Sequence, residues 1–161
     1  MRKLGIIAVL SLLLVAVTAA VASAASVHFK GGAPTFTDNG LTLTATGALA
    51  GLGNGNVQVK LLATGDPSAT CTNKGGTKAP GQNPASVDVT GTQNIPATQV
   101  KNGNLTFNVT TSAPAQPTPA QAGCPNNNWT AQITDLDFTR AQIQVFQNGL
   151  LVFESRVFTN V

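Results

Sequence analysis

The chain has 161 residues, with nine Lys or Arg, six Asp or Glu and a formal net charge of +3. Only 9% of the residues are charged, against about 25% in an average soluble protein, so Thr, Asn, Gln and Ser must supply most of the polar surface. A nucleic-acid partner would require a clustered basic face, and the sequence contains none. Weak charge also reduces repulsion between copies, so self-association is less opposed.

The first 24 residues have the organisation of a secretory signal peptide. Arg2 and Lys3 precede a long uncharged apolar stretch, and residues 22–24 (Ala-Ser-Ala) suit a signal peptidase. A permanent membrane anchor is the alternative, because the apolar stretch approaches the length of a bilayer span. The small residues favour cleavage after Ala24, which predicts a secreted protein in an extracellular, periplasmic or cell-surface location. Cleavage would leave a net charge of +1 and no further stretch long enough to cross a membrane.

Residues 25–161 are predicted to form a single all-β domain, because apolar and polar residues alternate and no helical period occurs. An irregular edge segment is expected at residues 28–36. Further strands are expected near residues 41–46, 57–61, 69–72, 87–89, 105–110, 129–133, 143–146 and 151–153. Turns are expected at residues 38–40, 51–55 and 65–68, and a crossover without a strand at residues 92–102. About eight or nine short strands predict a two-sheet antiparallel β-sandwich, immunoglobulin-like in outline.

Two local patterns in the last third of the chain make sharper predictions. The hydrophobic phase changes between Ile133 and Phe138, which predicts a bulge or turn around Asp135 and Asp137. Asn148-Gly149 separates two apolar runs. Asn-Gly accepts the positive φ angles of a type I′ turn, so a β-hairpin is expected there.

The two cysteines, Cys71 and Cys124, are expected to pair in an oxidising compartment. The predicted strand order places both at one end of the sandwich, provided that residues 95–101 form no strand of their own. The closed loop of roughly 54 residues would add about 4 kcal/mol in the chain-entropy model. A reactive or metal-binding thiol pair is disfavoured, because no histidine or second cysteine pair accompanies it.

The disulfide would hold together the two longest predicted loops, at residues 73–84 and 112–128, and binding residues often collect on such loops. Trp129 is expected to be in the core, with at most an exposed edge, because tryptophan is mostly buried. The candidate binding residues of these loops are Lys74, Lys78, Gln82, Asn83, Asn126, Asn127, Asn128 and Trp129.

Catalytic and metal sites are not indicated by the sequence. His28 is the only histidine and no G-x-S-x-G motif occurs, so no nucleophile–base pair is suggested. Asp135 and Asp137 could bind calcium, but two acids at a bulge are more often turn formers and calcium needs more oxygen ligands. No cofactor, metal or catalytic residue is therefore predicted. The sequence also contains three glycosylation sequons, at Asn104, Asn108 and Asn128.

Three stretches, residues 41–47, 71–76 and 79–84, resemble small exported bacterial-type β-sandwich proteins of unknown function. The predicted fold is similar in outline to immunoglobulin-like domains, although Trp129 follows both cysteines instead of lying between them. Because the function of those proteins is unknown, the resemblance implies no particular activity.

We expect a non-enzymatic extracellular module that binds a protein or cell-wall polymer, or that builds envelope or matrix. A secreted inhibitor or ligand acting through residues 112–124 is the alternative, and a small hydrolase is a third, less favoured hypothesis. Carbohydrate binding is a variant of the first expectation. It would need an exposed aromatic side chain, and the chain has one Trp, no Tyr and seven Phe.

Overall fold

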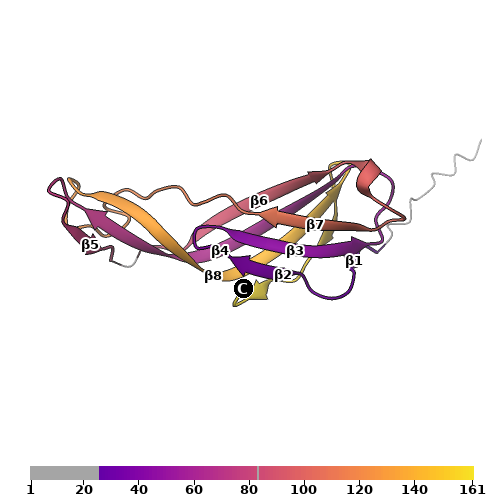
Figure 1. The fold of residues 1–161 in the computed structure, drawn as a ribbon, viewed down its shortest axis with the longest axis horizontal. Helices are drawn as coiled ribbons and strands as arrows, with labels where there is room; N and C mark the ends of the chain where they lie inside the picture. Colours follow the sequence, from indigo (N-terminus) through magenta and orange to yellow (C-terminus); the bar gives the residue numbers. More distant parts are fainter. Residues whose placement is uncertain (1–25, 83) are drawn as a thin grey trace, which may run out of the picture.

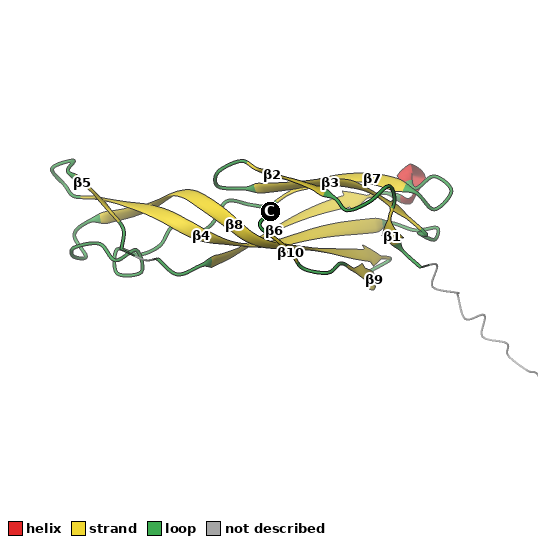
Figure 2. Cartoon of the chain, turned by 90° about the horizontal axis from the view of Figure 1, so that it is seen from below, coloured by secondary structure: helices red, strands yellow, loops and turns green. Residues whose placement is uncertain are grey.

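The computed structural model describes residues 26–82 and 84–161. The predicted signal peptide and its cleavage site lie outside these residues. The described chain forms two antiparallel sheets and one short 3-10 turn (Figures 1 and 2). Its elements, in chain order, are β1 (His28–Phe29), β2 (Thr35–Asp38), β3 (Leu43–Ala50), β4 (Val57–Thr72), β5 (Lys78–Pro80), β6 (Val87–Ile95), η1 (Ala97–Gln99), β7 (Leu105–Thr110), β8 (Thr130–Gln147), β9 (Leu150–Glu154) and β10 (Phe158–Thr159).

The smaller sheet is built around β3. On one side β3 pairs with β1 near its end and with β2 near its start, and on the other side it pairs with β7. The predicted edge segment at residues 28–36 is therefore confirmed as two short edge strands. Asp38 stabilises the turn that follows β2, because its carboxylate accepts a hydrogen bond from the Gly40 amide at 2.7 Å.

The larger sheet is built around two long strands, β4 and β8, which pair antiparallel from Val57 with Gln147 to Thr72 with Thr130. β6 and then β5 pair with the other side of β4. β9 and β10 pair with the other side of β8. Figure 1 shows β4 and β8 running almost the whole length of an elongated molecule.

The two sheets enclose the main hydrophobic core. Alternate residues of β4, such as Val59 and Leu61, face Leu43, Phe107 and other apolar side chains of the smaller sheet and are fully or almost fully buried. Period-two burial of this kind on both sheets defines a β-sandwich. The predicted all-β, two-sheet antiparallel fold is thus confirmed.

β4 and β8 continue beyond the smaller sheet. We call this part the extension: residues 66–82, which include the end of β4 and all of β5, residues 130–137 of β8, and the connecting residues 112–129 (Figure 1, left). Within the described residues, no second sheet packs on its inward face. Ile133 and Leu136 still belong to the main core, and a separate small cluster of Ala69, Ala122 and Ala131 is buried farther along the extension.

Three predicted boundaries are wrong. β5 forms within the loop that was predicted at residues 73–84. The turn expected at residues 65–68 does not form, and β4 passes through it without interruption. β6 extends to Ile95, so residues 92–95 belong to a strand and the crossover is shorter than predicted. The crossover contains η1 and no strand of its own among the described residues, which is the condition under which both cysteines were predicted to lie at one end.

The phase change in β8 is confirmed, and the structure shows two bulges where one was predicted. The register with β4 shifts at Thr64/Gly65 and again at Ser68/Ala69, leaving Thr139 and Thr134 without a cross-strand partner. Each bulged threonine donates its hydroxyl to a β4 carbonyl, at 3.4 and 3.2 Å. The Asn148-Gly149 hairpin is also confirmed, with positive φ at both residues (50° and 82°).

Candidate functional site

The Cys71–Cys124 disulfide lies in the extension. Cys71 is fully buried on the inward face of β4, and Cys124 belongs to the connection between β7 and β8. Their Cα atoms are 5.7 Å apart, so the prediction that both cysteines lie at one end of the fold is confirmed. The bond fixes the β7–β8 connection onto a face that no sheet covers.

Small residues let two loops approach this face closely. The Gly81 amide donates to the Ala69 carbonyl at 2.8 Å, and the Gln82 amide donates to the Ala122 carbonyl at 2.9 Å. A Cβ atom on Gly81 would lie 2.7 Å from the Ala122 oxygen and 2.9 Å from the Ala69 Cβ. Both distances are shorter than van der Waals contact, so this approach requires glycine.

The Pro-rich part of the connection lies along β8. Pro114, Pro117 and Pro119 are half-buried while their neighbours are exposed. The Gln116 side chain accepts a hydrogen bond from the Ile133 amide at 2.7 Å. Residues 112–124 are thus attached to the rest of the extension by a side-chain hydrogen bond, by a backbone hydrogen bond and by the disulfide.

The candidate binding residues predicted from sequence gather in the extension. The last cross-strand pair of β4 and β8, Thr72 with Thr130, places the loop at residues 73–77 beside the residues that precede β8. Asn83 lies outside the described residues. The exposed members are Lys74, Lys78, Gln82, Asn126, Asn127 and Asn128.

The predicted core position of Trp129 is wrong. It is half-buried and belongs to neither buried cluster, because it precedes β8 at the end of the extension, where the main core no longer reaches. Its amide donates to the Asn126 carbonyl at 3.2 Å. The tryptophan is therefore partly accessible beside the three asparagines, in contrast to the expected core position.

The acidic pair and the histidine lie apart from these loops. Asp135 and Asp137 are exposed on β8, where their cross-strand partners are Ser68 and Asp66. His28 is exposed on β1, and its Nδ1 atom is 2.7 Å from the Ser26 carbonyl oxygen. Within residues 26–82 and 84–161, no three His, Cys, Asp or Glu side chains are grouped as metal ligands.

The three sequons differ in their surroundings. Asn108 and Asn128 are exposed. The Asn104 side chain is half-buried and donates to the carbonyls of Asn102 and Lys101 at 2.8 and 3.3 Å. Use of the sequons stays a prediction.

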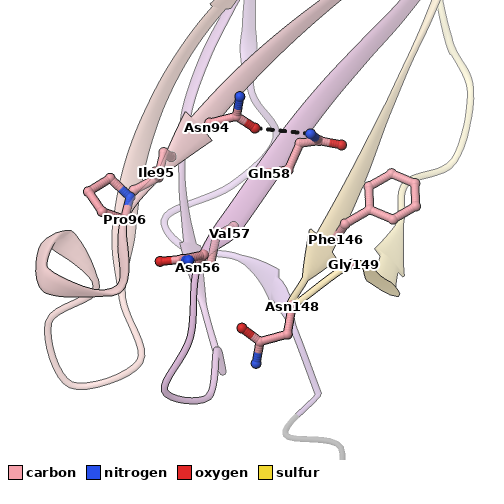
Figure 3. A pocket seen from close by; sticks show the side chains of 9 residues that line it. All are labelled: Asn56, Val57, Gln58, Asn94, Ile95, Pro96, Phe146, Asn148 and Gly149. Carbon is pink, nitrogen blue, oxygen red and sulfur yellow. Dashed lines mark hydrogen bonds between the residues drawn. The ribbon is translucent and has the colours of Figure 1, made fainter.

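A groove at the opposite end of the larger sheet was not predicted from the sequence. An open cavity of about 720 Å³ lies where β4 begins and where β6 and β8 end. Figure 3 shows side chains from the three strands around it. The alternation of buried and exposed residues predicts that Gln58, Asn94 and Phe146 lie on the outer face of the sheet. The sequence alone does not give the register of β4 with β6 and β8, which brings the three side chains together.

The register aligns these three side chains in one row. Gln58 is the cross-strand partner of Asn94 on β6 and of Phe146 on β8. The Gln58 Nε2 atom donates to the Asn94 Oδ1 atom at 3.0 Å (Figure 3, dashed line). Asn56, Pro96 and Asn148 complete the rim at the ends of the strands.

The fold and these sites define the chain as an all-β sandwich protein with one disulfide-anchored extension. The part of the chain that the structure describes holds no helix that could span a bilayer. No protein-family model and no curated protein matches the sequence.

Among solved structures, the chain is similar to DesR, a β-glucosidase from Streptomyces venezuelae in complex with D-glucose. The match has 16% sequence identity and a TM-score of 0.31, and covers 84% of this chain and 15% of the glucosidase chain. The chain therefore spans a small part of the length of that enzyme.

Proposed function

We propose that this protein is a secreted, non-enzymatic module that binds an extracellular protein or a cell-wall polymer, or helps to build the envelope or matrix. The observation that carries the proposal is the extension, where a disulfide anchors two loops on a rigid pair of strands. Loops fixed on a rigid scaffold lose little conformational entropy when they bind a partner. Export through the predicted signal peptide belongs to the same proposal.

The chemistry of the loops suits a weakly charged partner. The exposed side chains are mainly amides and two lysines, and the half-buried Trp129 adjoins the three asparagines. Amides donate and accept hydrogen bonds equally well, and a partly exposed tryptophan adds apolar contact area. Such a surface suits a polymer or a protein with a polar surface.

An inhibitory role of residues 112–124 is a second proposal. The disulfide and the Gln116–Ile133 hydrogen bond hold this exposed segment in one conformation, as a rigid ligand requires. The half-buried prolines favour it less, because they turn part of the segment toward β8.

The test begins with secretion of the full chain from an expression host and recovery of the protein from the medium. We expect a mature amino terminus at Ala25 or close to it by mass spectrometry if the signal peptide is cleaved as proposed. The recovered protein is then incubated with cell-wall, envelope and polysaccharide fractions, and its oligomeric state is measured by light scattering across concentrations. Retention on a fraction, or concentration-dependent assembly, is the expected result.

Paired variants connect the result to the extension. Replacement of Trp129 by Ala and of Asn127 by Ala should reduce retention, whereas Thr92→Ala, on the exposed outer face of β6, should not. A protein that stays in the cell, or a strict monomer that no fraction retains, would contradict the proposal.

A further inference from the structure

We infer that the groove at the start of β4 is a second binding site, which takes a neutral oligosaccharide. This site lies at the opposite end of β4 from the extension, so the inference does not depend on the loops proposed above. Three properties of the groove support it: oriented hydrogen-bonding groups, an aromatic ring and the lack of ionisable side chains among its described lining residues.

The amide side chains of the groove are oriented and keep free hydrogen-bonding capacity. The Asn56 Oδ1 atom accepts from the Ala97 amide at 3.0 Å, and Asn94 Oδ1 accepts from Gln58 at 3.0 Å. Each of these bonds uses one group of the amide. The NH₂ groups of Asn56 and Asn94 and the carbonyl oxygen of Gln58 form no other hydrogen bond within the described residues, so donors and an acceptor are fixed in place.

The aromatic ring provides the apolar part of the site. Phe146 is half-buried, and it lies next to Gln58, on the side of Gln58 opposite Asn94 (Figure 3). Adjacent strands are about 4.8 Å apart, so the row from Asn94 to Phe146 spans roughly 10 Å. A ring flanked by amides can contact the C–H face of a sugar while the amides bond its hydroxyl groups.

Among the described residues, the groove has no ionisable side chain, and this favours uncharged ligands over charged ones. None of the described residues that line it is ionisable, so no side chain there can form an ion pair with a phosphate, a carboxylate or an ammonium group. Neutral hydroxyl groups both donate and accept hydrogen bonds, as the amides do. The cavity of about 720 Å³ falls in the range typical of small-molecule sites and is open enough for a chain to continue past it.

The inference is tested on the full chain as secreted. The probes are three neutral oligosaccharides, maltohexaose, cellohexaose and chitohexaose, and one charged probe, hexagalacturonate, each titrated by calorimetry. At least one neutral probe should bind, and hexagalacturonate should bind at least tenfold more weakly. Phe146→Ala and Asn94→Ala should each weaken binding of the neutral probe by tenfold or more.

Matched variants separate binding from folding. Phe146→Tyr keeps the ring and should keep binding within about threefold, and Thr92→Ala should behave as wild type. Thermal unfolding of every variant shows whether the fold is retained. Absence of binding by all three neutral probes would overturn the inference, as would equal or tighter binding of hexagalacturonate.

The loop variants distinguish the two proposals. If Trp129→Ala abolishes oligosaccharide binding while Phe146→Ala leaves it intact, the groove inference fails and the extension gains support. If the reverse is found, the groove is supported whatever partner the extension binds.

Discussion

Two buried hydroxyl groups, those of Thr111 and Ser155, accept hydrogen bonds from strand amides at the points where the neighbouring strand has ended. Thr111 follows β7, and its hydroxyl accepts from the Leu43 amide at 3.0 Å while its own amide donates to the Leu43 carbonyl at 2.9 Å. Ser155 follows β9 and forms the same pair of bonds with Ile143, both at 2.9 Å. Each side chain thus replaces a carbonyl that the ladder no longer supplies, which matters because a buried amide without a partner is costly.

Thr111→Val should destabilise the fold, because valine has nearly the same shape and cannot accept the Leu43 hydrogen bond. We expect the free energy of unfolding to fall by about 1–3 kcal/mol, measured by urea denaturation. Thr111→Ser retains the hydroxyl and should lose less stability than the valine variant. Equal stability of wild type and valine variant would show that the hydroxyl contributes nothing.

Single aromatic residues are the hardest to place from sequence. The residue type of Trp129 predicts a core position, yet the side chain lies beyond the end of the main core. The alternation along β8 predicts that Phe146 is on the outer face of the sheet. Only the strand register shows that it lies next to Gln58. Burial of a single side chain depends on where a neighbouring layer ends, and the sequence does not contain that information in local form.

At the scale of elements, Gly65, Pro67 and Ser68 illustrate why local turn signals can mislead. These residue types favour turns, yet all three lie within β4. Pro67 lies between the two bulges, where β6 has ended and β5 has not begun. Proline is tolerated at bulges and on unpaired edges, so the strand continues where the composition predicted a reversal.

The β8–β9 hairpin was predictable, because Asn-Gly has few alternatives to a type I′ turn. Gly149→Val should destabilise the hairpin, since a β-branched residue is strained at a φ of 82°. We expect a loss of about 1–2 kcal/mol, measured by thermal unfolding. Asn148→Gly keeps the positive φ accessible and should change stability by less; a valine variant as stable as wild type would contradict this explanation.

At the scale of the whole molecule, alternation predicted the all-β sandwich, and the strand order predicted that the two cysteines lie at one end of it. The elongation was not predicted, because nothing local shows that β4 and β8 continue past the smaller sheet. β3 has eight residues and β7 has six, whereas β4 has 16 and β8 has 18. The part of β4 and β8 that the smaller sheet does not cover is covered instead by residues 112–124, which the disulfide holds in place.

Removal of the disulfide should therefore loosen the extension before the sandwich. In the Cys71→Ala/Cys124→Ala variant we expect faster hydrogen exchange and proteolysis within residues 112–124, with exchange in β3 and β7 little changed. The bond should contribute about 4 kcal/mol to global stability at most, for a closed loop of this size. Uniformly faster exchange in both sheets would show instead that the extension and the sandwich unfold as one unit.

The continuous pairing of β4 with β8 also has a mechanical consequence. If a partner held the extension while another ligand held the groove, tension between them would be directed along these two strands. Their ladder would then be loaded in shear, so many backbone hydrogen bonds would share the force and none would bear it alone. An anchored protein of this shape would resist pulling along its long axis better than peeling from one edge.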